Sequence, residues 1–489
     1  MTPTKLPSYS GKDASVPNQI LEVEETKDTY QDSSSIHSTK DDLVISPEER
    51  RLIAKLDRRI LPIVCLMYLF SYLDRSNVGN ARLQGLADDA LHGDPTGVLY
   101  DWVFSAFFFS YVLCQVPAVV ASKLFPPHLW LGTAAVGWGV CSTLMSTGFN
   151  FAGLFVARVG LGLFEACFGP GIPLYLSYYY TRHELGLRLA YYQSFAAVAG
   201  AFSGLVAFGI QNAHAAIANW RLLFIIEGIP TVLAGITAIL LLPQRPEMTR
   251  FLSEEERKIA IERMNRAISG DVGFKINKTH VGAAFKDWRV YVGGVVYFGV
   301  NCGFASISGF LPTIIKSFGF TNATAQLLTV PPYAVAGIIL IISSYASDRV
   351  QNRGFFIAAA NMVSGIGNVI LLAVQTNQHA RYFAVFCITS GTFVSIGLLI
   401  AWYAHNLGSE TKRATGMPLF MAIGLLSDLE LWPVSCALEF TSTFAAIILS
   451  ASYILENRRR DRAFGKPTPE DKVDTSELAD KAPMFRYVP

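Results

Sequence analysis

Charged residues are scarce in this sequence of 489 residues. Asp, Glu, Lys and Arg make up only 16% of it, whereas soluble domains carry about 25%. Hydrophobic residues reach 51%, and the mean hydropathy is +0.35. This composition excludes an ordinary soluble domain and indicates a polytopic membrane protein. The formal charge of +2 is carried by basic residues in loops between apolar runs, so no nucleic-acid partner is indicated.

The usual signatures of scaffolds and enzymes are missing as well. The seven cysteines lie in apolar segments, their number is odd, and no two are spaced as CxxC. We therefore predict neither a disulfide framework nor a metal site, and expect no cofactor. The sequence has no His-rich cluster, no GxSxG motif and no P-loop, so an enzyme is not expected. The first 40 residues lack an apolar signal sequence, so the first membrane span should act as its own insertion signal.

Apolar runs recur along the chain instead. A run of about 20 residues is long enough to cross ~30 Å of hydrocarbon as a helix. Twelve such runs are predicted near 60–81, 99–122, 129–147, 152–177, 188–211, 221–242, 289–311, 326–346, 355–374, 381–403, 414–426 and 432–454. We therefore expect an all-α polytopic membrane protein with two six-helix bundles, residues 46–243 and 289–455. A cytoplasmic loop with an amphipathic helix, residues 244–288, should join them.

Polar segments flank and connect these bundles. Residues 1–45 cannot bury enough apolar surface to order, which predicts a disordered cytoplasmic tail. Ser46 with Glu49 and Ser253 with Glu256 have the spacing of capping boxes, and the second should open a helix to about Arg266. Residues 456–489 form a second cytoplasmic tail, expected to be disordered after Pro467.

Loop charges set the orientation. Cytoplasmic loops are enriched in Lys and Arg, so the basic residues just before the first apolar run and at Arg458–Arg462 predict that both termini are cytoplasmic. The basic residues of the loops that should be cytoplasmic are Lys123, Arg182, Arg188, Arg349, Arg353, Lys412 and Arg413. We expect a monomer with many spans in the lipid bilayer of the plasma membrane.

The eleventh run is too short. Ala414 to Leu426 has 13 residues, about 20 Å of helix, before the polar stretch Ser427–Glu430 intervenes. A deletion, a mistaken splice or a genuine half-helix would each explain this.

The fourth run carries two charges. Arg158 and Glu165 lie within the apolar stretch from Leu154 to Tyr180, where a charge costs at least ~2.5 to 3.5 kcal/mol on insertion scales. Seven residues apart, they share one helix face about two turns apart. Gly169-Pro170-Gly171 should bend this helix. We interpret the charges as one wall of a transport cavity, although a buried Arg–Glu pair that only locks two helices is the alternative.

Several motifs resemble one transporter family. Leu73-Asp74-Arg75-Ser76-Asn77-Val78-Gly79-Asn80-Ala81 looks like the first-span motif of the anion:cation symporter family within the major facilitator superfamily, in particular its fungal allantoate permease branch. Further matches are Arg158–Gly171, Trp220–Pro230, Phe251–Arg257, Pro331-Pro332-Tyr333 and Thr411–Gly416. The resemblance implies proton-coupled import of a small organic anion across a fungal membrane. It also implies an anion-binding role for Arg75 and Arg158 and a proton-coupling role for Glu165.

Two departures from that family stand out. An arginine that some relatives carry in the seventh span has no counterpart here, and Asn301 is the nearest polar candidate. Part of the eleventh span and the loop after it are missing relative to the family. A non-transporting homologue or a sensor is therefore one alternative function, and efflux of a small hydrophobic compound or secondary metabolite is another.

The remaining candidate residues follow from position and chemistry. A planar guanidinium can donate two parallel hydrogen bonds to a carboxylate, so Arg75 and Arg158 suit an anionic substrate. Asp74 is the second candidate for proton coupling, and Glu227 is expected to be structural. Further substrate-binding candidates are Asn77, Gln193, Tyr297 and Asn301, each of which could equally belong to the core. Asp348, Arg349 and Arg353, after the eighth span, are the predicted cytoplasmic gate, with Lys123 at the equivalent loop of the first half.

Overall fold

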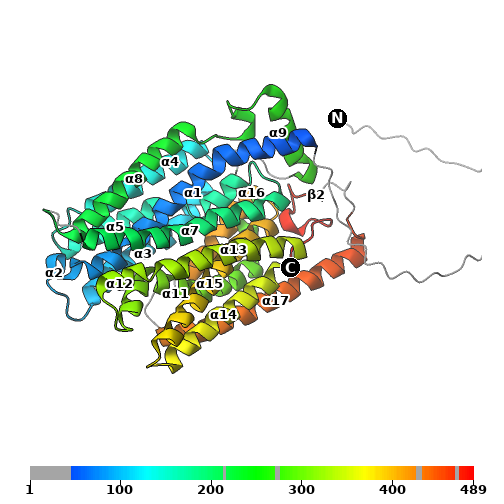
Figure 1. The fold of residues 1–489 in the computed structure, drawn as a ribbon. Coiled ribbons are helices and arrows are strands. Elements are labelled where there is room, and N and C mark those ends of the chain that lie inside the picture. Colours follow the sequence, from blue (N-terminus) through cyan, green and yellow to red (C-terminus); the bar gives the residue numbers. More distant parts are fainter. Residues whose placement is uncertain (1–45, 213–215, 270–275, 426–431, 468–472) are drawn as a thin grey trace, which may run out of the picture. The chain divides into compact units, whose positions relative to one another are not determined.

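A computed structural model describes residues 46–489 except 213–215, 270–275, 426–431 and 468–472 (Figure 1). The described chain is nearly all helical; its only strands are β1 (Ile268–Ser269) and β2 (Val473–Asp474), which pair in parallel. The predicted tail 1–45 and the polar stretch Ser427–Glu430 lie outside the described residues.

The described residues of the first half form eight helices. They are α1 (Pro47–Leu83), α2 (Leu86–Ala90), α3 (Val98–Ser122), α4 (Pro127–Met145), α5 (Phe151–Glu165), α6 (Gly171–Leu176), α7 (Arg182–Gln211) and α8 (Asn219–Leu241). The connecting segment forms η1 (Pro246–Met248), α9 (Glu254–Ala267) and α10 (Lys278–Phe285).

In the second half, the residues that the structure describes form seven helices and a short final turn. They are α11 (Trp288–Lys316), α12 (Asn322–Leu327), α13 (Val330–Val350), α14 (Arg353–Ala373), α15 (Gln378–Asn406), α16 (Glu410–Leu425) and α17 (Trp432–Phe464), followed by η2 (Ala479–Lys481). The described part of each predicted apolar run lies mainly on one helix, except that run 152–177 is divided between α5 and α6 and run 326–346 between α12 and α13.

Not every one of these helices is a span by length and composition alone. Seven helical segments of the described chain are long and apolar enough to cross a membrane. The two parts of α11, Trp288–Ala305 and Phe310–Lys316, meet at 53° and together make an eighth. Of the others, α5 and α16 have only 15 and 16 residues, and α1 carries Asp74, Arg75 and Asn77 in its apolar part. The polar residues that lower the hydropathy of α1 are the candidate functional ones.

The two halves repeat one packing scheme. In the first half α8 packs against α1 and α4, and in the second half α17 packs against α11 and α14. Contacts between the halves run from α7 to α13 and α15, from α3 to α16 and from α1 to α11. Helices α1, α7, α11 and α15 thus meet at the interface where a transport path would lie.

Both predicted helix starts are confirmed. The Ser46 hydroxyl accepts a hydrogen bond from the Glu49 backbone N–H at 3.1 Å, and Pro47 occupies the first helical position. Ser253 and Glu256 exchange reciprocal hydrogen bonds of 2.8 and 3.1 Å at the start of α9, which ends one residue beyond the predicted Arg266.

The prediction of disorder after Pro467 is wrong for residues 473–489. The Trp402 indole N–H donates to the Val488 carbonyl at 2.7 Å, and Asn406 exchanges two hydrogen bonds with the Val488 backbone, at 2.8 and 2.9 Å. Polar composition predicted a solvated tail, but α15 offers matching donors and acceptors. This tail lies at the end of the helices that carries α9 and β2, hereafter the α9 end; α2 and α12 lie at the opposite end (Figure 1).

Candidate functional site

Helix α5 ends at the charged residues. Arg158 and Glu165 are both buried on it, and Glu165 is its last residue. The chain turns through Gly169 and Pro170 before α6 begins at Gly171, so the predicted bend is a complete break. A side chain at Gly169 would collide with the Tyr111 hydroxyl, which is why α3 can lie so close to this turn.

A glycine on α5 brings α3 against the site. A Cβ added at Gly162 would collide with the carbonyl of Phe107 on α3. Because no side chain separates the two helices here, the rings of Phe107 and Tyr111 reach the charged residues of α1. The Arg75 guanidinium lies 4.9 Å from the Phe107 ring centroid and 5.3 Å from that of Tyr111, within the range of cation–π attraction.

Arg75 and Glu165 form an ion pair between α1 and α5, in which Glu165 is buried and Arg75 is partly exposed. Arg75 Nη2 donates to Glu165 Oε1, and the Ser71 hydroxyl donates to the same oxygen at 2.6 Å. Glu165 Oε2 is buried and has no hydrogen-bond partner in the part of the chain that the structure describes. One carboxylate oxygen thus holds the pair together while the other is unoccupied.

Arg158 stands outside this ion pair. Its Nη1 and Nη2 donate to the backbone carbonyls of Asp74 and Arg75, each at 3.4 Å, and its Nε has no partner among the described residues. No described carboxylate forms an ion pair with it, although its side chain is buried. Arg158 and Glu165 therefore both contact α1 from α5, in keeping with a shared helix face, but the carboxylate of Glu165 is paired with Arg75.

Asp74 faces a different neighbourhood. Its Oδ1 accepts from the Ser142 hydroxyl of α4 at 2.5 Å, and its Oδ2 accepts from the Thr231 hydroxyl of α8 at 2.8 Å. Asn77 and Glu227 lie beside one another near Asp74. Their buried side-chain polar atoms form no hydrogen bond of acceptable geometry with a described residue. The structure thus places Asp74 and Asn77 between α1, α4 and α8, away from the ring surfaces that surround Arg75.

The other predicted substrate-binding residues are spread over two interfaces. Gln193 on α7 lies beside Tyr68 of α1 and packs near Gly397 of α15, between the halves. Tyr297 on α11 packs against Gly424 and the Phe420 ring of α16. Asn301 is buried one turn further along α11.

Aromatic side chains, most of which the sequence did not single out, close the space between the halves. The Tyr72 ring of α1 meets the rings of Phe304 on α11 and Phe393 on α15 edge-on, at 5.6 and 6.2 Å. Phe393 also meets Tyr333 of α13 at 5.8 Å. Tyr333 belongs to the Pro331-Pro332-Tyr333 match, whereas the only sequence signal for Tyr72 is its position three residues before Arg75 on the same helix.

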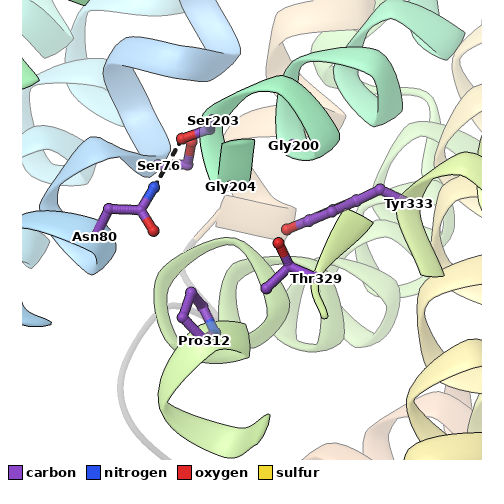
Figure 2. Close-up of a pocket in the computed structure, with 8 residues that line it drawn as sticks. All are labelled: Ser76, Asn80, Gly200, Ser203, Gly204, Pro312, Thr329 and Tyr333. Carbon is purple, nitrogen blue, oxygen red and sulfur yellow. Dashed lines mark hydrogen bonds between the residues drawn. The ribbon is translucent and has the colours of Figure 1, made fainter. Parts of the chain in front are cut away.

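A small pocket lies between the halves and shares Tyr333 with this group of aromatic side chains (Figure 2). Asn80 Nδ2 donates to the Ser203 hydroxyl at 2.7 Å across it. Its lining residues are Ser76 and Asn80 of α1, Gly200, Ser203 and Gly204 of α7, Pro312 of α11, and Thr329 and Tyr333 of the second half. Ser76 and Asn80 belong to the motif that begins at Leu73, so the motif lines both the charged site and the pocket.

The predicted gate residues lie at the α9 end, and two of the three meet. Arg353 Nη2 forms an ion pair with Asp348 Oδ1 at 2.5 Å. A Cβ added at Gly186 of α7 would collide with the Arg353 guanidinium and lie 3.0 Å from Asp348 Oδ1, so the pair sits directly on the first half. Arg349 is exposed and lies over the Tyr345 ring instead.

The equivalent loop of the first half makes a matching contact. Lys123, buried at the end of α3, donates to the Thr411 hydroxyl of α16 at 2.8 Å and lies 3.8 Å from Glu410 Oε2. Arg245 approaches the same Glu410 oxygen at 3.6 Å. The contact of the Asp348–Arg353 pair with Gly186 and the contact of Lys123 with α16 both join the halves and close the α9 end.

One buried carboxyl received no role from the sequence. Glu439 on α17 is 1% exposed and lies among polar side chains of α14. Its signal was a single acidic residue within the last apolar run, which is the pattern that drew attention to Glu165. Among the described residues, no group of three or more His, Cys, Asp or Glu is placed to hold a metal ion.

Comparisons with known proteins extend over most of the chain. The family model described as Major Facilitator Superfamily matches residues 64–465. The major facilitator-type transporter hxnP of Emericella nidulans is 32% identical over 463 residues, which cover 90% of this chain and 93% of that protein. The high-affinity nicotinic acid transporter of Saccharomyces cerevisiae is 31% identical over 508 residues, covering 98% and 92% of the two chains.

Solved structures give the same fold. The proton:xylose symporter XylE, a protein of E. coli, superposes with a TM-score of 0.62 at 14% identity and covers 88% of this chain and 98% of its own. At this identity the likeness shows the fold alone. It confirms the predicted all-α fold of two six-helix bundles.

Proposed function

The chain belongs to the Major Facilitator Superfamily and is a secondary transporter of that type, and we propose that it imports a small organic anion together with protons. The observation that carries this proposal is Arg158: a buried guanidinium with two long hydrogen bonds and no carboxylate partner among the described residues. A fixed positive charge in a water-poor interior favours an anionic ligand, and its planar fork matches a carboxylate.

The ion pair beside it supplies a means of coupling. A substrate carboxylate and Glu165 would compete for Arg75, since both are anions and the guanidinium already lies against Glu165. Protonation of Glu165, with its free Oε2 as the receiving atom, neutralises the competitor and releases Arg75 to the substrate. The anion leaves with the proton when Glu165 ionises again and recovers Arg75.

Charge balance supports one proton per monovalent anion in this half of the protein. Without substrate, Arg75, Arg158 and ionised Glu165 sum to +1. With substrate, the two arginines, the bound anion and neutral Glu165 also sum to +1. Because the net charge of the site is the same with and without substrate, the site avoids the desolvation cost of an uncompensated buried ion.

The substrate we propose is a vitamin or nitrogen-source carboxylate. Nicotinate is the first candidate because a relative of nearly the same length is named a nicotinic acid transporter. The motif at Leu73 to Ala81 favours the allantoate permease branch, whose members also suggest pantothenate, biotin and allantoate.

For the direction of transport, we assign the α9 end to the cytoplasm of a fungal cell and the protein to its plasma membrane, as a monomer with both termini inside. The basic residues Lys123, Arg245 and Arg353 gather at this end, as cytoplasmic loops require. The contacts at Gly186 and Glu410 then represent a state closed toward the cytoplasm.

Uptake in cells that lack their own carriers tests the proposal. Labelled nicotinate, pantothenate, biotin and allantoate are supplied with and without a protonophore, to cells with this protein and to cells with an empty vector. We expect uptake of at least one anion that the protonophore abolishes. Uptake of none of them, with the protein at the cell surface, would contradict the importer; uptake indifferent to the protonophore would contradict the coupling.

The short eleventh apolar run, which lies on α16, favours a second candidate, a homologue that does not transport. Its 13 residues, Ala414 to Leu426, correspond to about 20 Å of helix, less than the ~30 Å of hydrocarbon. Glu410 and Thr411 at the start of α16 still form the contact with Lys123, so a sensor that binds the anion without moving it is consistent with the structure. Binding of a labelled anion without accumulation would identify this case.

A further inference from the structure

Glu439 occupies a built polar site inside the second half. Its Oε1 lies 2.6 Å from the Ser364 hydroxyl and its Oε2 accepts from Asn368 Nδ2 at 2.9 Å. Both partners are buried on α14, one turn apart. A Cβ added at Gly303 of α11 would lie 2.6 Å from Glu439 Oε1, so the glycine leaves room for the carboxyl beside the α11 backbone.

No counter-charge accompanies this carboxyl. In the described chain no Lys, Arg or His forms an ion pair with Glu439, in contrast to Glu165, which has Arg75. Helices α11 and α14 pack against α17, and α15 brings Thr392 to the site. The thiols nearest along these helices are Cys302, next to Gly303 on α11, and Cys387 of α15, beside Gly367 of α14. An ionised carboxylate here would be an uncompensated buried charge, so the neutral acid is the favoured form in this conformation.

The hydrogen bonds fit both forms of the acid. Asn368 donates to Oε2 in either form. The Ser364 hydroxyl donates to Oε1 when the carboxyl is ionised, and accepts from Oε1–H when it is protonated. In the second case its own hydrogen has two acceptors, Thr392 Oγ1 at 3.2 Å and the Ile388 carbonyl at 3.4 Å. Because the hydrogen bonds of this site are satisfied in both protonation states of Glu439, the site is suited to proton exchange.

The site is also connected to the interface between the two halves. Thr392 is followed on α15 by Phe393, whose ring meets Tyr72 of α1 at the interface of the halves. A shift of α15 against α1 would therefore alter the Thr392–Ser364 contact and change the stability of the protonated form. This links the proton on Glu439 to the conformational cycle without direct contact with the Arg75 site.

We propose that Glu439, with Ser364 and Thr392, is a second proton-binding site, which takes up one proton from water as the acid forms and returns it as the carboxylate re-forms in another conformation. The proposal rests on the proposed function only for the role of this proton in transport; its binding is a separate claim. The complete cycle then carries the proton of Glu165 and the proton of Glu439 with each anion.

Infrared difference spectroscopy tests binding without any substrate. The full chain is reconstituted in lipid vesicles at neutral pH, and the spectrum of Glu439→Gln is subtracted from that of the original protein. We expect a carbonyl-stretch band of a protonated acid, shifted in Ser364→Ala because one hydrogen bond is lost, and absent from the same subtraction with the exposed Glu255→Gln. Loss of a carboxylate band in its place overturns the proposal. Ser364→Ala keeps the test open if Glu439→Gln does not fold.

Transport stoichiometry tests the role. With two protons per monovalent anion, uptake responds to a membrane potential set by a potassium gradient and valinomycin. Glu439→Gln should still concentrate the anion with a pH gradient but lose the response to potential, as the ratio falls from about two protons to about one. An unchanged ratio in Glu439→Gln overturns the second site and leaves the proposed function standing. Absence of proton-driven uptake in the original protein overturns the proposed function, while the infrared result still decides whether Glu439 binds a proton.

Discussion

Arg75 and Glu165 are joined through a single carboxylate oxygen, Oε1, while Oε2 of the same group is buried without a described partner. Ser71 also donates to Oε1, so this oxygen is saturated and a proton would be received at Oε2. The geometry makes Glu165 both the partner of Arg75 and the place where that partnership can be ended. Each half of this statement can be tested separately.

Glu165→Gln should separate substrate exchange from proton coupling. Gln keeps the size of the side chain but cannot ionise, so Arg75 loses its internal competitor. We expect net uptake driven by a pH gradient to be lost, whereas exchange of labelled external for unlabelled internal anion persists. Vesicles loaded with unlabelled substrate measure the exchange, and the exposed Glu262→Gln on α9 is the control. If exchange disappears together with net uptake while the protein is correctly folded, Glu165 serves something other than coupling.

Arg158 should determine affinity for the anion. A charge-assisted hydrogen bond contributes about 1.5–3 kcal/mol, so Arg158→Ala should weaken anion binding roughly 10- to 150-fold or abolish detectable uptake. Arg158→Lys retains the charge but not the fork and should lie between the two. Equilibrium binding to purified protein and uptake are both measured, with surface expression as a check. Arg459, 83% exposed on α17, provides the matched control Arg459→Ala. Loss of expression in Arg158→Ala, with affinity retained in Arg158→Lys, would favour a structural role for Arg158, through its hydrogen bonds to the α1 backbone, over a role in anion binding.

The fold was largely predictable because hydrophobic length is a one-dimensional property. Each apolar run corresponds to one helix or, for 152–177 and 326–346, to two consecutive helices, and the Gly-Pro-Gly at 169–171 correctly marked where α5 is interrupted. The docking of residues 473–489 was not predictable, since it depends on Trp402 and Asn406 from a helix about 80 residues earlier in the chain. Composition reports only that such a tail has no core of its own.

The candidate site was predictable in its members but not in its connections. The cost of a charge in an apolar run singled out Arg158 and Glu165, yet the choice of Arg75 as the partner of Glu165 depends on how α1 and α5 pack. Glu439 has the same signal, an acidic residue within an apolar run, but the sequence assigned it no role because its polar partners Ser364 and Asn368 are ordinary residues of another helix. Serine and asparagine are common within apolar runs, so their positions in the sequence do not reveal which carboxyl they contact.

The Asp348–Arg353 pair should hold the α9 end closed. Ser344 lies one turn before Asp348, is buried, and provides a reporter as Ser344→Cys in a background without the native cysteines. Adding Asp348→Asn should raise its labelling by a membrane-impermeant maleimide roughly 5- to 10-fold, the effect of about 1 kcal/mol from a partly buried ion pair. Arg349→Ala is the control because Arg349 is exposed and outside the pair. Equal labelling with and without Asp348→Asn would show that this pair does not close the path.

The tail contacts predict protected amides near the end of the chain. The Val488 N–H donates to Asn406 Oδ1 at 2.8 Å, and the Tyr487 N–H donates to Asn457 Oδ1 at 2.9 Å. Asn406→Ala should therefore accelerate hydrogen exchange at Val488, and Asn457→Ala at Tyr487, by roughly 5- to 10-fold for about 1 kcal/mol per hydrogen bond. Exchange read by mass spectrometry on C-terminal peptides measures both. Full exchange of these peptides at the earliest time in the unaltered protein would mean that the tail is not docked.

The contact between α9 and α1 should weaken in acid. Lys55 Nζ donates to Glu256 Oε2 at 2.6 Å, and this hydrogen bond, followed by that from the Ser253 backbone, holds the pKa of the Glu256 carboxyl below its ordinary value. An acid whose pKa is lowered in the docked state stabilises docking above its ordinary pKa. That stabilisation is lost as the pH falls through the lowered pKa. Both side chains are about one-third exposed, so the effect should stay below about 1 kcal/mol.

Hydrogen exchange of α9, corrected for the intrinsic dependence on pH, measures this effect. The unaltered protein should lose protection in α9 as the pH is lowered from neutral through the acid range. Glu256→Gln, which cannot ionise, should lack the part of this change that comes from the Lys55 contact; Glu255→Gln, on the neighbouring exposed position, should retain it. Identical acid profiles for the unaltered protein and Glu256→Gln would assign the loss of protection to other carboxyls, and the Lys55–Glu256 contact would then contribute nothing measurable to holding α9 on α1.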